Sequence, residues 1–304
     1  MMPNFLAKYA HLKRLGLILI LLSGLTTFLL AAPGLWANYA RILLFTILLY
    51  ATMALSYDVV GGMLGYLYLG HGVFFGLGAY ATAMALKLGQ PLLLALLLAA
   101  CLALPAAALL SLPLFRLRGA VFALATLGLL FLGGQLARNM SWWTGGSAGL
   151  SLPLNHKPML TYSLSLALAL VMIVVHWLVR GSRLGLKLSA IREDEDMAES
   201  VGINCATVKR LALIFSAIPA ALAGGLHARE ISFVIPSEAF GLESSLAPLL
   251  MCLLIKPGTT WGPLFGALIL TSAQEVIWTT LPRFHLSLYG ILLIFMGTQK
   301  ARRS

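Results

Sequence analysis

Long apolar runs without a charged residue recur along almost the whole of this 304-residue chain. Charged side chains make up 10% of the residues, hydrophobic ones make up 60%, and the mean hydropathy is +0.92. An ordinary soluble domain carries about 25% charged residues, so a soluble fold could not cover this chain with polar surface. Without water in the hydrocarbon layer, each spanning segment must satisfy its own backbone hydrogen bonds. The sequence therefore predicts an all-α polytopic membrane protein.

The apolar runs predict about ten transmembrane helices within a single transmembrane domain that covers residues 1–304. The first run follows the basic segment Lys8–Arg14. A signal peptide has an apolar core of only about 7–15 residues, so a spanning helix is favoured there. The expected spans are 15–35, 39–57, 72–88, 91–114, 119–137, 161–179, 209–228, 243–256, 261–280 and 285–299.

The basic residues give an orientation. With the N-terminus in the cytoplasm, most of the 21 Lys and Arg residues fall on the cytoplasmic side, as the positive-inside rule requires. We therefore expect a multi-pass protein with both termini cytoplasmic. The net charge of +11 is spread thinly between apolar runs. It forms no basic face, so we expect membrane lipid and not nucleic acid as a partner.

The longest polar segment of the chain, at about 181–208, carries half of the acidic residues within seven positions. Its apolar residues have a helical period over Ser182–Ile191. Asp194 or Asp196 could then cap a second short helix that runs through Val201, because an aspartate accepts hydrogen bonds from free N–H groups at a helix start. Gly202 is well placed to end that helix in a left-handed conformation.

Two interpretations of this loop compete. It could be a solvated loop whose charges only keep it in water, or an element that docks on a partner. The crowding of the acids and the glycine stop favour docking, because a helix this short needs a supporting surface. The chain contains no Walker A sequence, so an ATPase that drives it would be another subunit.

A second informative stretch, Asp58–Tyr80, contains seven glycines between positions 61 and 78. Glycine weakens a helix by about 1 kcal/mol relative to alanine, and it also lets helices approach closely, as Gly61-x-x-x-Gly65 and Gly72-x-x-x-Gly76 would allow. The segment could be a close packing contact, a broken helix whose unwound backbone lines a solute path, or both at once.

Ionisable residues within the apolar runs are few. Asp58 and His71 flank the glycine-rich stretch, and Glu275 lies inside an expected span. An acid in a membrane is costly and is a functional hypothesis by default, although Glu275 could also lie near the outer interface and His71 could bond backbone carbonyls. Cys101, Cys205 and Cys252 are far apart and read as apolar filler, and the sequence shows no metal cluster, catalytic triad or phosphate loop.

The loop and its flanks, from Ser182 to Ala228, resemble the coupling-loop region of ABC importer permeases, most closely those of branched-chain amino acid transporters. The importer motif Glu-Ala-Ala, three residues, then Gly reads here Asp196-Met197-Ala198, three residues, then Gly202. The glycine-rich stretch matches the same family at Gly65, Gly70, His71, Phe74, Phe75, Gly76, Gly78, Ala79 and Tyr80. The segments Arg118–Leu127, Thr144–Leu150 and Pro257–Pro263 extend the resemblance over about residues 40–300.

The resemblance implies the permease subunit of an ATP-driven importer in the bacterial inner (plasma) membrane, with amino acids as its solutes and branched-chain ones favoured. It implies cytoplasmic ABC ATPase subunits, a second homologous permease and a periplasmic or extracellular solute-binding protein as partners. This chain itself would bind no cofactor, since ATP and Mg would lie on the ATPase. The residues implied to engage the ATPase are Arg192, Glu193, Asp194, Glu195, Asp196, Ala198, Glu199 and Gly202. Those expected on the translocation path are Gly65, Tyr66, Gly70, His71, Phe75, Tyr80, Thr126 and Glu275.

Two other classes stay open from the residues alone. A self-contained ion- or proton-coupled transporter would use several intramembrane acids, of which only Glu275 and Asp58 are found. A membrane-embedded enzyme would need a nucleophile, a metal or an acid–base cluster. Within the permease class, urea, short amides and other small polar solutes remain alternatives. The sequence departs from the family at Tyr66, at Tyr68 and at Ile255-Lys256-Pro257, so the solute preference and the turn at 255–257 are where it could differ.

Overall fold

The computed structural model describes residues 35–152, 157–280 and 290 of the chain. The chain divides into two compact units, Met1–Thr46 and Ile47–Ser304, and helix α2 (Leu35–Asp58) leads into the second. The later elements are η1 (Val59–Met63), α3 (His71–Lys87), α4 (Leu92–Leu114), α5 (Gly119–Asn139), α6 (Ser141–Thr144), η2 (Gly146–Ala148), β1 (Leu150–Ser151), α7 (Pro158–Gly181), α8 (Arg183–Glu193), α9 (Glu195–Ser200), α10 (Cys205–Ile231), β2 (Phe233–Val234), α11 (Pro236–Ala239), α12 (Glu243–Leu254) and α13 (Trp261–Thr280).

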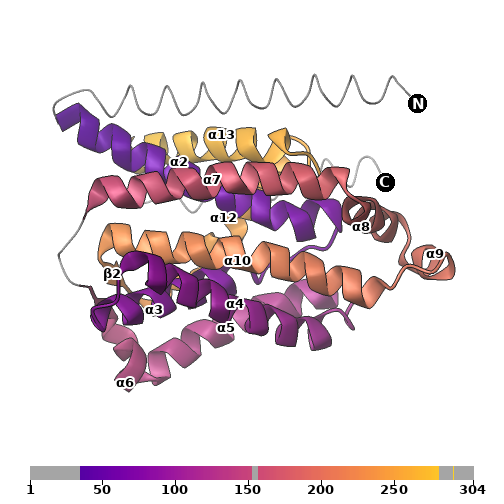
Figure 1. Cartoon of the computed structure of the whole chain (residues 1–304), viewed down its shortest axis with the longest axis horizontal. Helices are drawn as coiled ribbons and strands as arrows, with labels where there is room; N and C mark the ends of the chain where they lie inside the picture. Colours follow the sequence, from indigo (N-terminus) through magenta and orange to yellow (C-terminus); the bar gives the residue numbers. More distant parts are fainter. Residues whose placement is uncertain (1–34, 153–156, 281–289, 291–304) are drawn as a thin grey trace. The chain divides into compact units, whose positions relative to one another are not determined.

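Helices account for most of the described residues, so the predicted all-α polytopic class is confirmed (Figure 1). Six segments of the described chain are long and apolar enough to cross a membrane. The helices α4, α5, α7, α10, α12 and α13 lie within a few residues of expected spans. The expected spans 15–35 and 285–299 lie outside the described residues except for one residue each, and the count of about ten and the orientation stay predictions. The six segments are Asn38–Met63, Leu92–Leu114, Gly119–Asn139, Pro158–Gly181, Cys205–Ile231 and Pro236–Leu254.

Helix α10 is the packing centre of the Ile47–Ser304 unit. In the apolar stretch of α10, 61% of the residues are buried within the protein. In the apolar stretch of α4 the share is only 28%. Many side chains of α10 are Ala or Gly, which lets neighbouring backbones come close. A Cβ atom on Gly78 of α3 would lie 1.9 Å from the Ala221 carbonyl oxygen, and one on Gly224 would lie 2.0 Å from that of Phe75. The backbones of α3 and α10 therefore touch directly.

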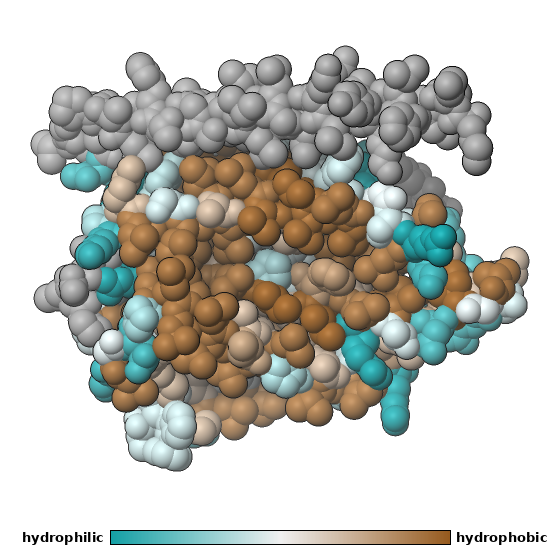
Figure 2. All heavy atoms as spheres, in the orientation of Figure 1, coloured by the Kyte–Doolittle hydropathy of each residue, from teal (hydrophilic) through white to brown (hydrophobic). Residues whose placement is uncertain are grey.

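Helix α4, by contrast, has large apolar side chains on its exposed side. Leucines on its outer side, among them Leu93, Leu97 and Leu109, are at least 60% exposed. Figure 2 shows apolar side chains over the middle of the molecule, with polar ones gathered toward its two ends. Such a band is what a hydrocarbon layer requires of a spanning bundle.

The glycine-rich stretch is a broken helix, as one of the two sequence interpretations predicts. After Asp58 the helix widens into the π-helical turn η1, and the backbone is irregular from 64 to 70 until α3 begins at His71. Gly65 adopts a φ of +82°, which residues with a Cβ rarely adopt. The prediction that Gly61 and Gly65 form a helix-packing pair is therefore wrong, because Gly65 lies in the irregular segment and Gly61 faces the ring of Tyr57 on its own helix.

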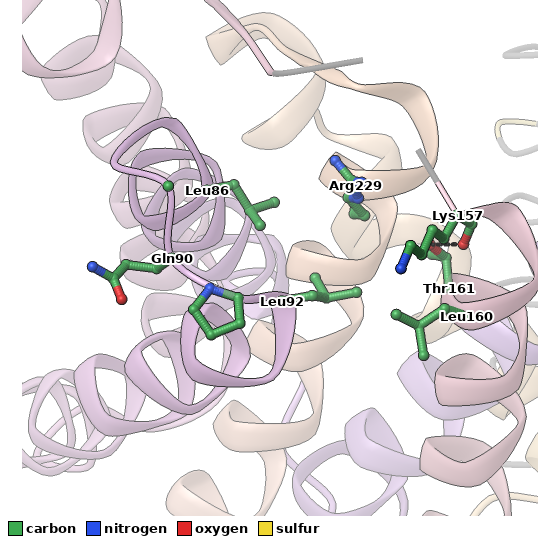
Figure 3. A pocket seen from close by; sticks show the side chains of 9 residues that line it. Leu86, Gln90, Leu92, Lys157, Leu160, Thr161 and Arg229 are labelled. Carbon is green, nitrogen blue, oxygen red and sulfur yellow. Dashed lines mark hydrogen bonds between the residues drawn. The ribbon is translucent and has the colours of Figure 1, made fainter. Parts of the chain in front are cut away.

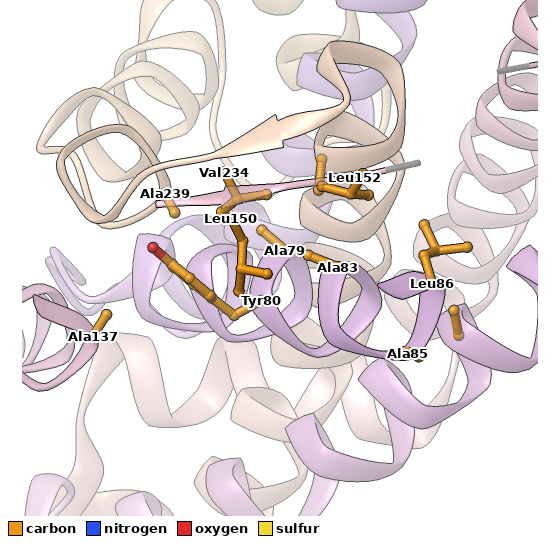
Figure 4. Close-up of a cluster of buried hydrophobic side chains, with 12 residues drawn as sticks. Ala79, Tyr80, Ala83, Ala85, Leu86, Ala137, Leu150, Leu152, Val234 and Ala239 are labelled. Carbon is orange, nitrogen blue, oxygen red and sulfur yellow. The ribbon is translucent and has the colours of Figure 1, made fainter. Parts of the chain in front are cut away.

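A two-stranded sheet, which the sequence did not predict, lies at the opposite end of this unit from α8 and α9 (Figure 1). Leu150 pairs with Val234 and Ser151 with Phe233 in antiparallel register. Gly145, Gly146 and Gly149 lead into β1 with positive φ angles, which glycine adopts without steric cost. Behind the sheet, Leu150 and Val234 pack with Tyr80 in a buried apolar cluster (Figure 4).

Candidate coupling site

Helices α8 and α9 form as the residue pattern predicts. The Ser182 hydroxyl caps α8 by accepting hydrogen bonds from the N–H groups of Leu184 and Gly185. Of the two predicted caps for the next helix, Asp194 is the one used. Its carboxylate accepts the N–H groups of Asp196 at 2.9 Å and Met197 at 3.0 Å. These bonds satisfy donors that would otherwise be free at a helix start.

Gly202 ends α9 as predicted. It adopts a φ of +86°, and its N–H donates to the Glu199 carbonyl at 2.9 Å while that of Ile203 donates to Ala198 at 3.0 Å. This pair of bonds is a Schellman motif, which requires a residue in the left-handed region at the position of Gly202. The six residues of α9 are thus fixed at both ends by side chain and backbone.

Glu195, the first residue of α9, points back into the bundle. Its carboxylate accepts a hydrogen bond from the Tyr66 hydroxyl at 2.9 Å and pairs with the Lys209 ammonium at the start of α10. Arg118 is a third partner, with its Nη2 at 3.5 Å from Glu195. The Glu195 side chain is only 16% exposed, so these contacts hold α9 against three segments of the membrane domain.

Lys209 is the deeper member of this pair. It is 1% exposed, and its ammonium also lies 5.0 Å from the centre of the Tyr66 ring, within the range of a cation–π contact. Burial acts to raise the pKa of Glu195, but the hydrogen bonds from Lys209 and Tyr66 and the charges of Lys209 and Arg118 outweigh it and hold that pKa below its ordinary value. Burial and the bond to Glu195 raise the pKa of the Tyr66 hydroxyl, which stays a donor.

Arg192, the penultimate residue of α8, makes a second connection. Its Nη1 donates to the Gly62 carbonyl of the π-helical turn at 2.6 Å. A Cβ atom on Gly65 would lie 2.7 Å from the Arg192 Cγ, so the arginine stem lies directly on the irregular backbone. The loop between α7 and α10 is therefore bonded to the helix break at two places, through Arg192 and through Glu195.

The other face of α9 is open. Met197 is 66% exposed and Val201 is 75% exposed, while Ala198 between them is buried. Asp196 pairs with Arg118 at 3.2 Å but stays largely exposed. Glu193 and Glu199 are exposed as well. The predicted coupling residues thus divide into an inner set that anchors the element and an outer set that is available to a partner.

Within the part of the chain that the structure describes, the residues predicted on the translocation path lie at several separate places. Gly65 and Tyr66 lie against the α8–α9 element, and the Gly70 and Thr126 backbones approach each other where α3 begins, with the Leu69 N–H donating to Thr126 Oγ1 at 3.1 Å. His71 is fully buried between Ser56 and Ser216 at 3.1 and 3.3 Å. The remaining three lie elsewhere. Phe75 lies beside His227, and Tyr80 stacks on Phe240. Glu275 is half-buried on α13, next to Gln274, whose amide donates to Glu243.

A cavity of about 400 Å³ opens at the end that carries the sheet, between the α3–α4 turn, the start of α7 and the end of α10 (Figure 3). Leu86, Leu92 and Leu160 make much of its wall, and Lys157 and Arg229 bring two cations to its side. Neither cation stands out in the sequence as a site residue, because each reads as an ordinary charge at a span end.

Other residues of the coupling site escape sequence reasoning for a similar reason. Lys209 and Arg118 read only as topological charges, and Tyr66 reads as a path residue. One sequence signal could have suggested the pair with Glu195. Lys209 lies near the start of an apolar helix, 14 positions after this acid of a short helix.

The fold and this site define a multi-pass membrane protein with a short helical element anchored to a broken helix at one end. A family model described as "Branched-chain amino acid transport system / permease component" matches residues 39–297. The chain therefore belongs to the branched-chain amino acid transport permease family, and it is a multi-pass protein of the inner membrane.

Two curated relatives are similar to it. Both carry the name "High-affinity branched-chain amino acid transport system permease protein LivM", one from Escherichia coli (strain K12) and one from Salmonella typhimurium (strain LT2). Each is 29% identical over an alignment that covers 82% of this chain, and the chain spans 66% of the length of each relative. No solved structure matches the chain.

Proposed function

We propose that this chain is the membrane-spanning permease subunit of an ATP-binding cassette importer, which moves a branched-chain amino acid across the inner membrane with separate ATPase subunits as its motor. The observation that carries the proposal is the anchoring of α9 through Glu195 to Tyr66 and Lys209. A loop that only kept its charges in water would have no reason to bury a carboxylate against the membrane domain.

The ATPase would engage the open face of α9. Met197 and Val201 present apolar side chains there, and the exposed acids Glu193 and Glu199 frame them. ATP and Mg would be held by the ATPase. Closure of that partner would displace α9, and the bonds of Glu195 and Arg192 would carry the displacement to the helix break.

The opposite end would receive the solute-binding protein. There the short sheet joins the loop before α7 to the loop after α10, so that the two loops form one surface. A second permease subunit would complete the translocation path. Membership of the family supports both partners.

An aliphatic amino acid fits the cavity at this end better than the other solutes considered. The leucines would take up an apolar side chain, while Lys157 and Arg229 would attract its carboxylate. Urea and short amides carry no negative charge for the two cations to bind, and a sugar has no aliphatic side chain to pack against the leucines. We therefore place the outer solute contact at this cavity.

The proposal is tested in proteoliposomes that contain the purified transporter with its co-purifying subunits. Uptake of radiolabelled leucine should require ATP inside the vesicle and the binding protein on the other side. In a Cys101→Ser background, Met197→Cys should cross-link to the ATPase, and Leu124→Cys, exposed on the outer side of α5, should not. Leucine flux through the isolated chain that follows an ion or proton gradient, without ATPase, would instead establish the self-contained transporter.

A further inference from the structure

A second buried polar cluster lies near the coupling site without being part of it. Asp58, at the end of α2, is fully buried and its two oxygens are fully used. Oδ2 lies 2.8 Å from His176 Nε2 of α7, and Oδ1 accepts the Gly258 N–H and the Cys252 thiol, each at 2.8 Å. The other imidazole nitrogen, Nδ1 of His176, lies 3.1 Å from the Thr260 hydroxyl.

The cost of this cluster indicates that it serves more than packing. A carboxylate removed from water is destabilising unless its partners are well placed, and an apolar replacement of similar volume is often as stable. Here one carboxylate ties together α2, α7, α12 and the turn between α12 and α13. An apolar residue at position 58 could fill the same space but could not fix the mutual positions of these four segments.

The cluster is continuous with the coupling site. A Cβ atom on Gly62 would lie 1.8 Å from Asp58 Oδ1 and 2.6 Å from the Gly258 nitrogen, so the π-helical turn is pressed against both. The carbonyl of the same Gly62 accepts the hydrogen bond from Arg192. An unbroken series of contacts therefore runs from Arg192 on α8 through Gly62 and Asp58 to His176 on α7.

We infer that Asp58 and His176 are positioning residues that transmit the movement of the α8–α9 element to α7 and α12. The inference rests on the proposed function and deepens it. When Arg192 shifts, Gly62 and the carboxylate beside it must shift too, because no free space separates them. A buried network of this kind has a few discrete arrangements and no continuous range of them, so a small displacement at α8 becomes a repacking of α7 and α12.

The test compares Asp58→Asn and Thr260→Val with two matched controls. Asparagine keeps the size of Asp58 but cannot accept bonds at both side-chain atoms, and Thr260→Val removes only the hydroxyl that meets His176. Thr260→Ser restores that hydroxyl. Ser165→Ala removes a buried hydroxyl from α7, the helix that carries His176. That hydroxyl donates to the Tyr162 carbonyl within α7 itself.

In the reconstituted transporter we expect both cluster variants to retain the ATPase subunits and their basal hydrolysis. Leucine uptake should fall at least tenfold, so that more ATP is hydrolysed per solute moved. Thr260→Ser and Ser165→Ala should behave as wild type. A merely structural role would lower uptake and hydrolysis together, in proportion to the folded protein recovered. That result, or wild-type coupling in both cluster variants, would overturn the inference.

Hydrogen exchange separates this inference from the proposed function. In Asp58→Ala, which removes both side-chain oxygens, the Gly258 amide should exchange faster because it loses its acceptor, and the amides of residues 195–202 should exchange faster as well. That second change requires the relay and does not depend on transport. If the wild type lacks ATP-driven uptake, the proposed function fails while exchange still decides the relay. Faster exchange at Gly258 with unchanged exchange at 195–202 would refute it.

Discussion

The Tyr66 hydroxyl donates a hydrogen bond to the Glu195 carboxylate over 2.9 Å, although 129 positions separate the two residues. Tyr66 belongs to the irregular backbone before α3, and Glu195 begins α9. Because Lys209 shares the same carboxylate, the break in the membrane helix and the short helix outside the bundle are fastened at one buried charge. This contact makes specific predictions about α9.

Removing the charge of Glu195 should uncouple the transporter. Glu195→Gln leaves Lys209 buried without its counter-charge, and breaking such a pair costs about 3–5 kcal/mol. We expect α9 to detach and ATP-driven leucine uptake to fall at least tenfold, while the chain still inserts into the membrane. Lys187→Gln is the control, because it neutralises an exposed charge on α8 that takes no part in anchoring α9. Equal uptake in the two variants would contradict an anchoring role for Glu195.

The same carboxylate predicts a pH dependence. The pKa of Glu195 is lower in the folded protein than its ordinary value of 4.5. Its contribution to the stability of the docked α9 is therefore complete above that ordinary value and is lost as the pH falls through the lowered, folded value. Fluorescence of a probe at Val201→Cys, in a Cys101→Ser background, should report undocking only in that acid range. In Glu195→Gln the probe should show the undocked signal already at neutral pH, and a docked signal there would refute the assignment.

Local structure in this loop could be predicted from sequence because its signals are local. The caps at Ser182 and Asp194 and the stop at Gly202 each involve atoms within a few residues, so residue type alone constrains them. The broken helix could be predicted in the same way from the density of glycines. Most helix bounds were also close, because the hydrocarbon layer imposes length and composition on a span.

Long-range partners could not be predicted in this way. The sequence places Tyr66 on the solute path because it lies in the glycine-rich stretch, yet what decides its role is a carboxylate far along the chain. Likewise Asp58 stands out as an acid in an apolar region, but nothing in the sequence connects it with His176 or Gly258. A charge pair between two helices depends on how the helices pack, and packing leaves no regular spacing of residues in the sequence.

Gly72 and Gly76 should tolerate no large side chain. A Cβ atom on Gly72 would lie 2.0 Å from the Ser244 hydroxyl, and one on Gly76 would lie 2.5 Å from the Phe240 ring. Overpacking of such contacts typically costs about 1–3 kcal/mol. We expect Gly72→Leu and Gly76→Leu to lower the melting temperature and the uptake. Gly128→Leu on α5 is the control, since a Cβ there meets nothing within 4 Å. A melting temperature of the Gly76 variant equal to that of the control would contradict the close packing.

The cations at the outer cavity should determine affinity for the solute and not the efficiency of coupling. If Lys157 and Arg229 attract the amino-acid carboxylate, Lys157→Gln and Arg229→Gln should each raise the concentration of loaded binding protein at half-maximal uptake about tenfold. The ATP hydrolysed per leucine moved should stay at the wild-type value, because α9 and its anchors are untouched. Arg138→Gln, an exposed arginine at the end of α5, controls for the loss of one positive charge. If that concentration rises equally in all three variants, the effect comes from general attraction of the binding protein. If it rises only in the two cavity variants, and not for a neutral solute analogue, the solute carboxylate lies between Lys157 and Arg229.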